Sequence, residues 1–447
     1  MIFRMNQRSA AQAGTPGRFQ RIRDSLPLAF AVALGIRLLV LAFQYQGALN
    51  PARDHWAFGY EGGRIARAMV LGRGYSDPLF AETGPTAIAA PLYMLLMAGV
   101  FKVFGIYTTV SGLVILSLDC LFSALTCLPI YFIGCESFGA AVGGWAAWAW
   151  ALFPFSIFHS TQLISDVCLA TLLLTCIFLT TLRFERPAPL AAWAGFGLLW
   201  GITALDNPSV LSLLPFLCGW VCYRLHRQGR AWRMPVTVAG LALVLVISPW
   251  VARNYHVFHR FIPFRDNFWQ NIYIGNNADS LHFNWAASHT ATTPEEMEEF
   301  YRLGELGFMA KKREQAIEFI RSHPRFVACL TLRRIVQTWT RFWSLPAGGR
   351  LDETFDPDEP FDPAAIIFCT GLTVLSLTGL WRAFALHSTV AWPYALALLV
   401  FPLIYYLTNT FERYRHPIDP EIVILAVYAI TGRAGGPVRE EHVKRVC

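Results

Sequence analysis

Long apolar runs separated by short polar segments are the dominant pattern of this chain. The runs lie at residues 26–43, 89–104, 111–134, 140–158, 167–182, 190–205, 210–222, 236–251, 364–380, 390–407 and 422–431. A helix needs about 20 residues to cross about 30 Å of hydrocarbon, and neighbouring Trp, Tyr, Gly or Pro residues extend the shorter runs. The pattern therefore predicts an all-α polytopic membrane protein with about 10–11 transmembrane helices.

The composition argues against a wholly soluble protein. Of the 447 residues, 55% are hydrophobic and only 15% are charged, whereas an average soluble protein has about 25% charged residues. A soluble chain of this length would divide into about two or three domains, each with a polar surface of its own. Lipid-facing surfaces do not need that polar cover, so the low charge content supports a membrane protein.

Basic clusters set the expected orientation. Arginines crowd the segment before the first run, the loop 224–233 and the tail 432–447. The positive-inside rule places all three in the cytoplasm. If every run crossed, the loop 224–233 would lie outside, so one earlier run is not a full crossing, and the short run 89–104 is the first suspect. No cleavage site of small residues follows the first run, so no cleavable signal peptide is expected.

Two hydrophilic parts then fall on the non-cytoplasmic side. The predicted parts are a cytoplasmic N-terminal segment (1–25), a membrane domain (26–251) with a first outer loop (44–88), an outer-face region (252–363), C-terminal membrane helices (364–431) and a cytoplasmic tail (432–447). The first outer loop is too short to form an independent domain. The outer-face region is expected to be small and mostly helical.

Helix signals mark both outer parts. Residues 55–71 form an amphipathic pattern, which predicts a helix lying in the membrane interface. Thr293-Pro-Glu-Glu296 is a capping box with Pro at the first helical position, and it predicts a helix at 297–304. Two more helices are predicted at 311–321 and 325–343, and the last is expected along the membrane surface because it combines several arginines with aromatic residues.

The cysteine and histidine residues predict neither a metal site nor a set of disulfides. Most of the 10 Cys residues fall inside apolar runs, where a thiol behaves as a small hydrophobe. His159, His282 and His289 are too scattered to predict a metal site. The net charge of +7 gathers in the cytoplasmic segments, so topology accounts for it and no nucleic-acid partner is expected.

Charged residues gather in the first outer loop beside bulky aromatics. They are Arg53, Asp54, Glu61, Arg64, Arg67, Arg73, Asp77 and Glu82. Glu61, Arg64 and Arg67 are three residues apart, which places them near one face of a helix. One interpretation is an interfacial helix with solvated charges. The other is a carboxylate that acts as general base, with arginines that hold an anionic group.

Short motifs extend this pattern along the chain. In and after the first outer loop they are Arg64-Ile-Ala-Arg67-Ala-Met, Leu71-Gly-Arg-Gly-Tyr75, Pro85-Thr-Ala87, Ala90-Pro-Leu-Tyr93 and Val103-Phe-Gly105. Downstream they are Ser248-Pro-Trp250, Arg253-Asn-Tyr255 and Arg413-Tyr-Arg-His-Pro-Ile-Asp-Pro420. In this order the motifs resemble those of the C-type membrane glycosyltransferases, most closely the group of protein O-mannosyltransferases and lipid A aminoarabinose transferases (family 39-like).

The resemblance implies a multi-span enzyme that takes a sugar from a polyprenyl-phosphate donor. Transfer would occur outside the cytoplasm, in a bacterial inner membrane, to a lipid, glycan or protein acceptor. The family's base in this inverting displacement is a first-loop acidic residue, but its usual acidic pair would fall on Phe58 and Gly59. Glu61 and Asp54 are therefore the catalytic candidates, and Glu61 is favoured because it shares the predicted helix with the arginines. The resemblance leaves a divalent metal open as cofactor.

Arginines are the expected ligands of the donor phosphate. Arg64 and Arg67 are the first candidates, followed by Arg253, Arg413 and Arg415. Arg253 could instead anchor a helix end at the lipid headgroups. Arg413 and Arg415 could instead form structural ion pairs.

Three further residues complete the candidates, and two of them, Asp166 and Asp206, lie at expected outer helix ends. Tyr93, in the proline-containing motif, is a candidate for substrate binding. Asp166 is another, because a carboxylate at the membrane junction marks a functional position. Asp206 precedes Asn207-Pro208, and we favour a helix cap for it.

Two other classes of protein compete with the enzyme. A transporter or flippase for a lipid-linked or anionic substrate would need mid-membrane carboxylates or broken helices, and preferably two similar halves. Arg37 is the main charge deep in a run and no half-repeat is evident, so this class ranks second. A scaffold protein that descends from such an enzyme but has lost its activity ranks third.

Overall fold

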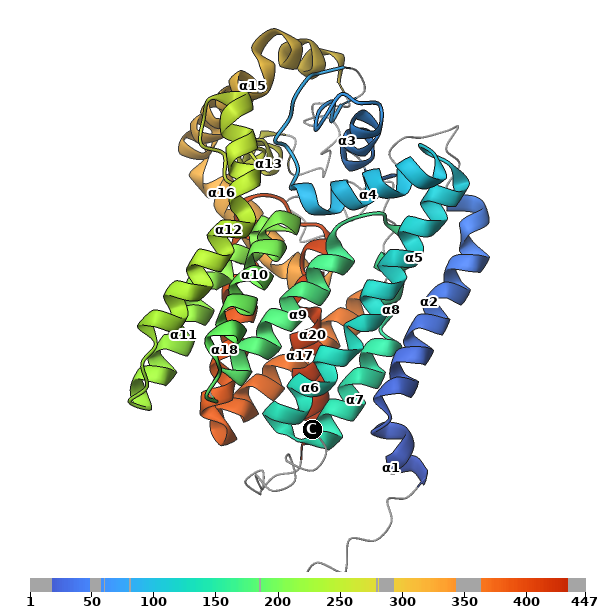
Figure 1. Cartoon of the computed structure of the whole chain (residues 1–447), viewed down its shortest axis with the longest axis vertical. Helices are drawn as coiled ribbons and strands as arrows, with labels where there is room; N and C mark the ends of the chain where they lie inside the picture. Colours follow the sequence, from blue (N-terminus) through green and yellow to red (C-terminus); the bar gives the residue numbers. More distant parts are fainter. Residues whose placement is uncertain are drawn as a thin grey trace, which may run out of the picture.

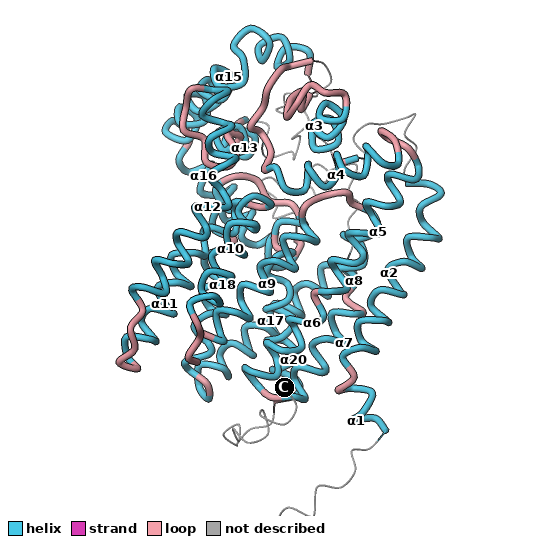
Figure 2. The backbone as a smooth tube through the Cα atoms, in the orientation of Figure 1, coloured by secondary structure: helices cyan, strands magenta, loops and turns pink. Residues whose placement is uncertain are grey.

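The chain folds, in a computed structural model, into a helical bundle covered at one end by a layer of other helices (Figure 1). The structure describes residues 18–48, 58–59, 61–79, 82–184, 186–278, 280, 293–342 and 363–432. Over these residues the helices are joined by loops, with one isolated β-bridge between Ser76 and Pro85 (Figure 2). The predicted all-α polytopic membrane fold is confirmed.

The bundle contains most of the chain. Its elements are α2 (Leu26–Ala48), α5 (Thr109–Leu125), α6 (Cys127–Phe138), α7 (Ala140–Ala151), α8 (Pro154–Gln162), α9 (Val167–Arg183), α10 (Leu190–Asp206), η2 (Pro208–Leu213), α11 (Leu214–Arg227), α12 (Arg233–Phe258), α17 (Pro363–Leu386), α18 (Ser388–Val400), α19 (Leu403–Leu407) and α20 (Asp419–Thr431). Nine of the 13 residues of α20 are buried, including all of the first eight. This short C-terminal helix is therefore central to the core.

Six described segments are long and apolar enough to cross a membrane. They are Leu26–Tyr45, Thr109–Phe138, Pro208–Arg227, Arg233–Phe258, Pro363–Leu386 and Thr389–Leu407, and α7 with α8 adds a seventh if this pair, bent by 42°, forms one span. The 17-residue helices α9 and α10 and the 13-residue α20 lie among these spans (Figure 1). Length and composition thus support fewer spans than the 10–11 predicted, because several runs form short helices within the bundle.

Helix α4 (Pro91–Phe104) resolves the conflict in orientation. It lies at the covered end of the bundle and does not run along it (Figure 1). Its 14 residues would rise only about 21 Å, too little to cross the hydrocarbon. With α4 left out of the count of crossings, the basic segments all lie at the end of the bundle opposite α4 (Figure 1). These segments are at α1 (Arg18–Arg23), at the turn between α11 and α12, and at the end of α20. The run 89–104, the first suspect, is the one that does not cross.

Arg37 of α2 holds the bend between α7 and α8. It is fully buried and its guanidinium donates to the backbone oxygens of Trp150 (3.2 Å) and Ala151 (3.1 Å). It also donates to the hydroxyls of Ser123 (2.9 Å) and Ser156 (2.6 Å). A bent helix leaves carbonyls without their usual amide partners, and an arginine can supply the missing donors. The deepest charge of the first run is thus bound to the protein's own backbone.

The outer layer consists of α3 (Glu61–Val70), α4, α13 (Phe268–Gly275), α15 (Pro294–Ser322) and α16 (Pro324–Thr340). Helix α3 corresponds to the predicted helix 55–71, of which residues 55–57 and 60 lie outside the described part. Thr293 caps the helix as predicted, since its side chain accepts a hydrogen bond from the amide of Glu296 at 3.4 Å. The Glu296 carboxylate, which would complete the capping box, instead accepts from Lys312 at 2.7 Å. The helices predicted at 297–304 and 311–321 join into α15, which is kinked at Gly304, where φ is 68°.

The first outer loop and the outer-face region pack into one layer. The Ala87 amide donates to a carboxylate oxygen of Glu305 on α15 at 2.6 Å, and the Asp266 amide donates to the Ala87 carbonyl at 3.0 Å. Apolar contacts reinforce this joint through Leu79, Ile88, Phe300, Phe308 and Met309. The layer therefore covers the end of the bundle as a unit.

Candidate functional site

A cavity of about 580 Å³ lies where the outer layer meets the bundle. It is lined by the start of α3, by α4 and α13, and by the outer ends of α8, α10 and α19 with the segments that follow them. Its titratable lining residues are Glu61, Tyr93, His159, Asp166, Asp206, Arg265, Tyr405, Arg413 and Tyr414. The volume is in the range of ligand sites, which join apolar walls to a few convergent polar groups. We call it the main cavity.

Glycines bring Glu61 to this cavity. A side chain on Gly59, which has φ of 81°, would place its Cβ 2.8 Å from the backbone oxygen of Ile164, and one on Gly62 would place its Cβ 2.6 Å from the sulfur of Met94. The backbone at the start of α3 therefore packs directly against the segment before α9 and against α4. Glu61 lies between the two glycines and lines the cavity.

Asp166 contributes a second carboxylate from the segment that leads into α9. It lines the main cavity. Burial raises the pKa of Asp166, and the positive charges of Arg265 and Arg413 act in the opposite direction. A carboxylate and two guanidinium groups, from three distant parts of the sequence, are therefore close enough to interact across the cavity.

The two arginines are held in different ways. Arg265 donates to the hydroxyl of Ser209 at 3.2 Å. The guanidinium of Arg413 lies 5.3 Å from the ring centroid of Phe411 and 5.5 Å from that of Tyr414, within the range of cation–π contact.

Tyr93 connects the cavity to a deeper acid. Its ring is almost fully buried in α4, and its hydroxyl donates to a carboxylate oxygen of Asp119 on α5 at 2.7 Å. Tyr93 therefore forms part of the cavity wall and anchors α4 to the bundle at the same time.

The structure brings together some of the predicted site residues. Glu61, Tyr93, Asp166 and Arg413 all line the main cavity. Asp54, the second catalytic candidate, lies outside the described residues.

The first-choice phosphate ligands, Arg64 and Arg67, lie elsewhere on α3. Arg64 is 5% exposed and donates to the Pro78 carbonyl at 3.4 Å, whereas Arg67 is exposed. Both act on Tyr107: burial raises the pKa of Tyr107 to about 12, and the two positive charges oppose that shift. Glu61 lines the main cavity, whereas Arg64 and Arg67 are not among the residues that line it.

Arg253 joins the two outer parts. Its guanidinium donates to the backbone oxygens of Thr86 (2.7 Å) and Tyr75 (2.6 Å). It also lies over the rings of Tyr75, at 5.4 Å, and Trp250, at 5.1 Å. These contacts favour neither lipid headgroups nor a donor phosphate, and they assign Arg253 to holding the first loop against the end of α12.

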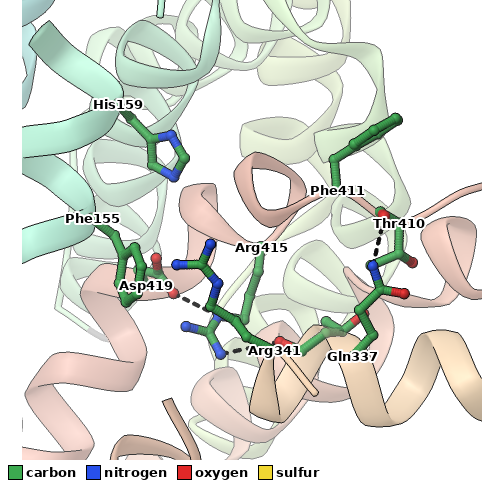
Figure 3. A pocket seen from close by; sticks show the side chains of 9 residues that line it. Phe155, His159, Gln337, Arg341, Thr410, Phe411, Arg415 and Asp419 are labelled. Atoms are coloured by element: carbon green, nitrogen blue, oxygen red, sulfur yellow. Dashed lines mark hydrogen bonds and ion pairs between the residues drawn. The ribbon is translucent and has the colours of Figure 1, made fainter. Parts of the chain in front are cut away.

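Arg415 lies beside a second, smaller cavity of about 20 Å³, which shares His159 and Phe411 with the main one (Figure 3). It is ion-paired with Asp419 at 2.9 Å and donates to the Thr338 carbonyl at 3.1 Å. His159 points toward this pair in Figure 3. Arg415 therefore forms a structural ion pair, which is one of the two roles predicted for it from the sequence.

Two residues of the cavity were missed or misread in the sequence. Arg265 was not singled out, since nothing in its neighbourhood distinguishes it from other outer arginines. Asp206 was interpreted as a helix cap, and that is wrong: Asn207 supplies the cap, its side-chain oxygen accepting from the Ser209 amide at 3.1 Å. Asp206 itself ends α10 and lines the main cavity. Among the described residues, no three His, Cys, Asp or Glu side chains group as metal ligands.

Solved structures with a similar fold include the oligosaccharyltransferase of Archaeoglobus fulgidus. Its apo form matches with a TM-score of 0.53 and 14% sequence identity, over 91% of this chain and 50% of that chain. The archaeal enzyme AglB from the same organism, in complex with an inhibitory peptide and a dolichol-phosphate, matches with a TM-score of 0.52 and 14% identity, over 91% and 49%. This chain thus spans about half the length of these oligosaccharyltransferases.

A looser match is ArnT from Cupriavidus metallidurans bound to undecaprenyl phosphate. Its TM-score is 0.38, with 14% identity over 91% of this chain and 77% of that chain. No protein-family model matches the sequence, and no curated protein matches it. The matched oligosaccharyltransferase is a C-type membrane glycosyltransferase, so the resemblance first seen in the motifs is confirmed at the level of the fold.

Proposed function

We propose that the protein is a membrane glycosyltransferase that moves a sugar from a polyprenyl-phosphate donor to an acceptor hydroxyl. The observation that carries this proposal is the main cavity, which Glu61 and Asp166 line together with Arg265 and Arg413. The fold supports it, because one oligosaccharyltransferase of that fold was solved with a dolichol-phosphate. The acceptor is a lipid, glycan or protein.

The position of the cavity suits a lipid-linked donor. A polyprenyl tail stays in hydrocarbon while its phosphate and sugar stay at the interface. The main cavity lies between the bundle and the outer layer, and in this proposal that level corresponds to the membrane interface. Arg265 and Arg413 are the side chains that would hold the phosphate, since a guanidinium pairs with phosphate oxygens through two parallel hydrogen bonds.

Glu61 is the residue we assign as base. In the transfer, the acceptor oxygen attacks C1 of the sugar as its proton passes to the Glu61 carboxylate. The bond between C1 and the phosphate oxygen breaks, and polyprenyl phosphate leaves with the electron pair. The arginines stabilise the charge that returns to the phosphate, and attack opposite the leaving group inverts the configuration at C1.

The basic clusters support an outward-facing site. The turn between α11 and α12 lies at the end of the bundle opposite the outer layer (Figure 1). Arg224 and Arg227 are in the last turn of α11, and Arg230 follows in the turn itself. The positive-inside rule puts that end in the cytoplasm. The proposal therefore places the main cavity at the periplasmic or exterior face of the plasma membrane, a bacterial inner membrane.

The transporter alternative gains no support from Arg37. Its side chain is engaged with backbone oxygens and hydroxyls of α7, α8 and α5. A charge held in this way fixes a bend and offers no binding site for a transported anion.

Sugar transfer in detergent tests the proposal. Membranes that contain the protein are incubated with radiolabelled undecaprenyl-phosphate sugars, and extracts of the native host provide the acceptors. A covalent product is expected with the wild type, and Glu61→Gln is expected to lower its rate by about 100-fold or more. Glu82→Gln, at an exposed position in the same loop, is the matched control. A protein that moves lipid-linked sugar across vesicles without any covalent product would refute the proposal.

A further inference from the structure

Asp206 has a buried carboxylate without a structural task. It is 2% exposed, and neither of its oxygens has a hydrogen-bond partner among the described residues. Its side chain lines the main cavity. The cap of the following helix comes from Asn207, so Asp206 is not retained for that purpose. Buried polar groups nearly always have partners, so one without them that also lines a cavity is a candidate to bind what enters the cavity.

The groups around the Asp206 carboxyl are negatively charged or carry partial negative charge. Asp206 is the last residue of α10, and the C-terminal end of a helix carries partial negative charge. The charged groups acting on it are the carboxyls of Asp166 and Asp119, both of the same sign. Asp119 has a donor of its own in the Tyr93 hydroxyl. Asp206 therefore needs hydrogen-bond donors other than those that the described residues supply.

Asp166 and Asp206 have different charged neighbours. Arg265 and Arg413 act on Asp166, and these guanidinium groups attract a phosphate. The charged neighbours of Asp206 are the carboxyls of Asp166 and Asp119, which do not attract a phosphate. A neutral group with several hydroxyl donors fits beside Asp206, because each hydroxyl can donate to a carboxylate oxygen.

We propose that Asp206 recognises the sugar of the lipid-linked donor, its two carboxylate oxygens accepting hydrogen bonds from two hydroxyls of the ring. This inference rests on the proposed function and adds a specificity-determining residue to it. The ligand class is a neutral polyhydroxylated sugar joined to a polyprenyl phosphate. The phosphate occupies the region of Arg265 and Arg413, and the ring lies between them and the end of α10.

Carrier binding with and without a sugar tests this assignment. The dissociation constants of undecaprenyl phosphate and of its mannose, glucose and arabinose derivatives are measured in detergent for the wild type, Asp206→Asn and Asp206→Ala. Glu136→Gln, near the opposite end of the bundle and paired with Arg183, serves as matched control. The wild type is expected to bind at least one derivative about tenfold more tightly than the bare carrier.

Both Asp206 variants are expected to lose that preference while binding the bare carrier within about twofold of wild type. Retained binding of the bare carrier also shows that the variants are folded. The assignment is overturned if Asp206→Asn keeps the preference for a sugar, if both variants lose bare and glycosylated carrier equally, or if the wild type shows no preference. A wild type that binds no carrier at all refutes the proposed function itself, which separates the two failures.

Discussion

A carboxylate oxygen of Glu305 accepts a hydrogen bond from the Ala87 amide at 2.6 Å, across 218 residues of sequence. This contact joins the second outer part of the chain to the first. Asp266 donates its own amide to the carbonyl of Ala87, and its carboxyl interacts electrostatically with that of Glu305. Two acids therefore share the joint that covers the main cavity.

This joint should make stability depend on pH. Burial raises the pKa of Asp266 to about 6, and burial, followed by the charge of Asp266, raises the pKa of Glu305 well above its usual value. The folded state then binds more protons than the unfolded state, in which both acids titrate near pH 4. The two acids contribute favourably to the free energy of unfolding. This contribution is complete below about pH 4 and is lost as pH rises through about 6 and beyond.

Glu305→Gln tests the pH dependence, because glutamine imitates the protonated acid and can still accept from Ala87. The variant is expected to unfold at a higher temperature than wild type at pH 8, by several degrees, and at a similar temperature at pH 4.5. Thermal unfolding in detergent across this range is the measurement. Glu82→Gln, an exposed acid, should show no such difference, and a pH-independent effect of Glu305→Gln would contradict the mechanism.

Arg37→Met should destabilise the bundle. Methionine fills the space but removes the guanidinium donor from the buried Ala151 carbonyl, whereas the Trp150 carbonyl keeps the Phe153 amide as a donor. An unsatisfied buried group costs about 1–3 kcal/mol, so a loss of about 1–3 kcal/mol in the free energy of unfolding is expected. Arg233→Met, at the exposed start of α12, is the control. Equal unfolding temperatures for wild type and Arg37→Met would show that the bend does not depend on this arginine.

The membrane fold was largely predictable from the sequence, because apolar runs and basic clusters are local signals. The capping box at Thr293 predicted the start of α15, and the short run 89–104 was identified as the non-crossing segment. The number of spans was less predictable. A buried helix such as α20 and a lipid-facing helix such as α12 both read as apolar runs in the sequence. In addition, length alone does not separate a short crossing from an interfacial helix.

The site was only partly predictable, because it joins segments that are far apart in the chain. Glu61 and Arg413 were identified through local motifs and do line the same cavity. Arg265 faces the cavity whereas Arg253 binds backbone carbonyls, and no local sequence signal indicates this difference. It depends on how the chain turns after the end of α12. Asp206 was wrongly predicted to be the helix cap for a specific reason. Asp and Asn are both good caps, and in the folded chain the neighbouring Asn207 takes this role.

Gly59→Ala should lower transfer without abolishing carrier binding. Its φ of 81° disfavours alanine, and the new Cβ would approach the Ile164 oxygen at 2.8 Å. The start of α3 must move, and Glu61 moves with it, so kcat is expected to fall about tenfold or more. Gly72→Ala is a matched control, since it has the same φ of 81° and open space around it. If Gly72→Ala lowers kcat equally, backbone strain and not the contact with Ile164 is responsible.

Arg265→Gln and Arg413→Gln should each weaken binding of bare undecaprenyl phosphate. A charge-assisted hydrogen bond contributes about 1.5–3 kcal/mol, so each change is expected to raise the dissociation constant about 10- to 100-fold. The effect should shrink at high salt because the interaction is ionic. Arg67→Gln, on the exposed face of α3, should bind the carrier as wild type does, and Arg253→Gln should lower the unfolding temperature without a comparable loss of affinity. If Arg67→Gln loses carrier binding while Arg265→Gln and Arg413→Gln keep it, the phosphate lies against the first loop and the assignment of the main cavity is wrong.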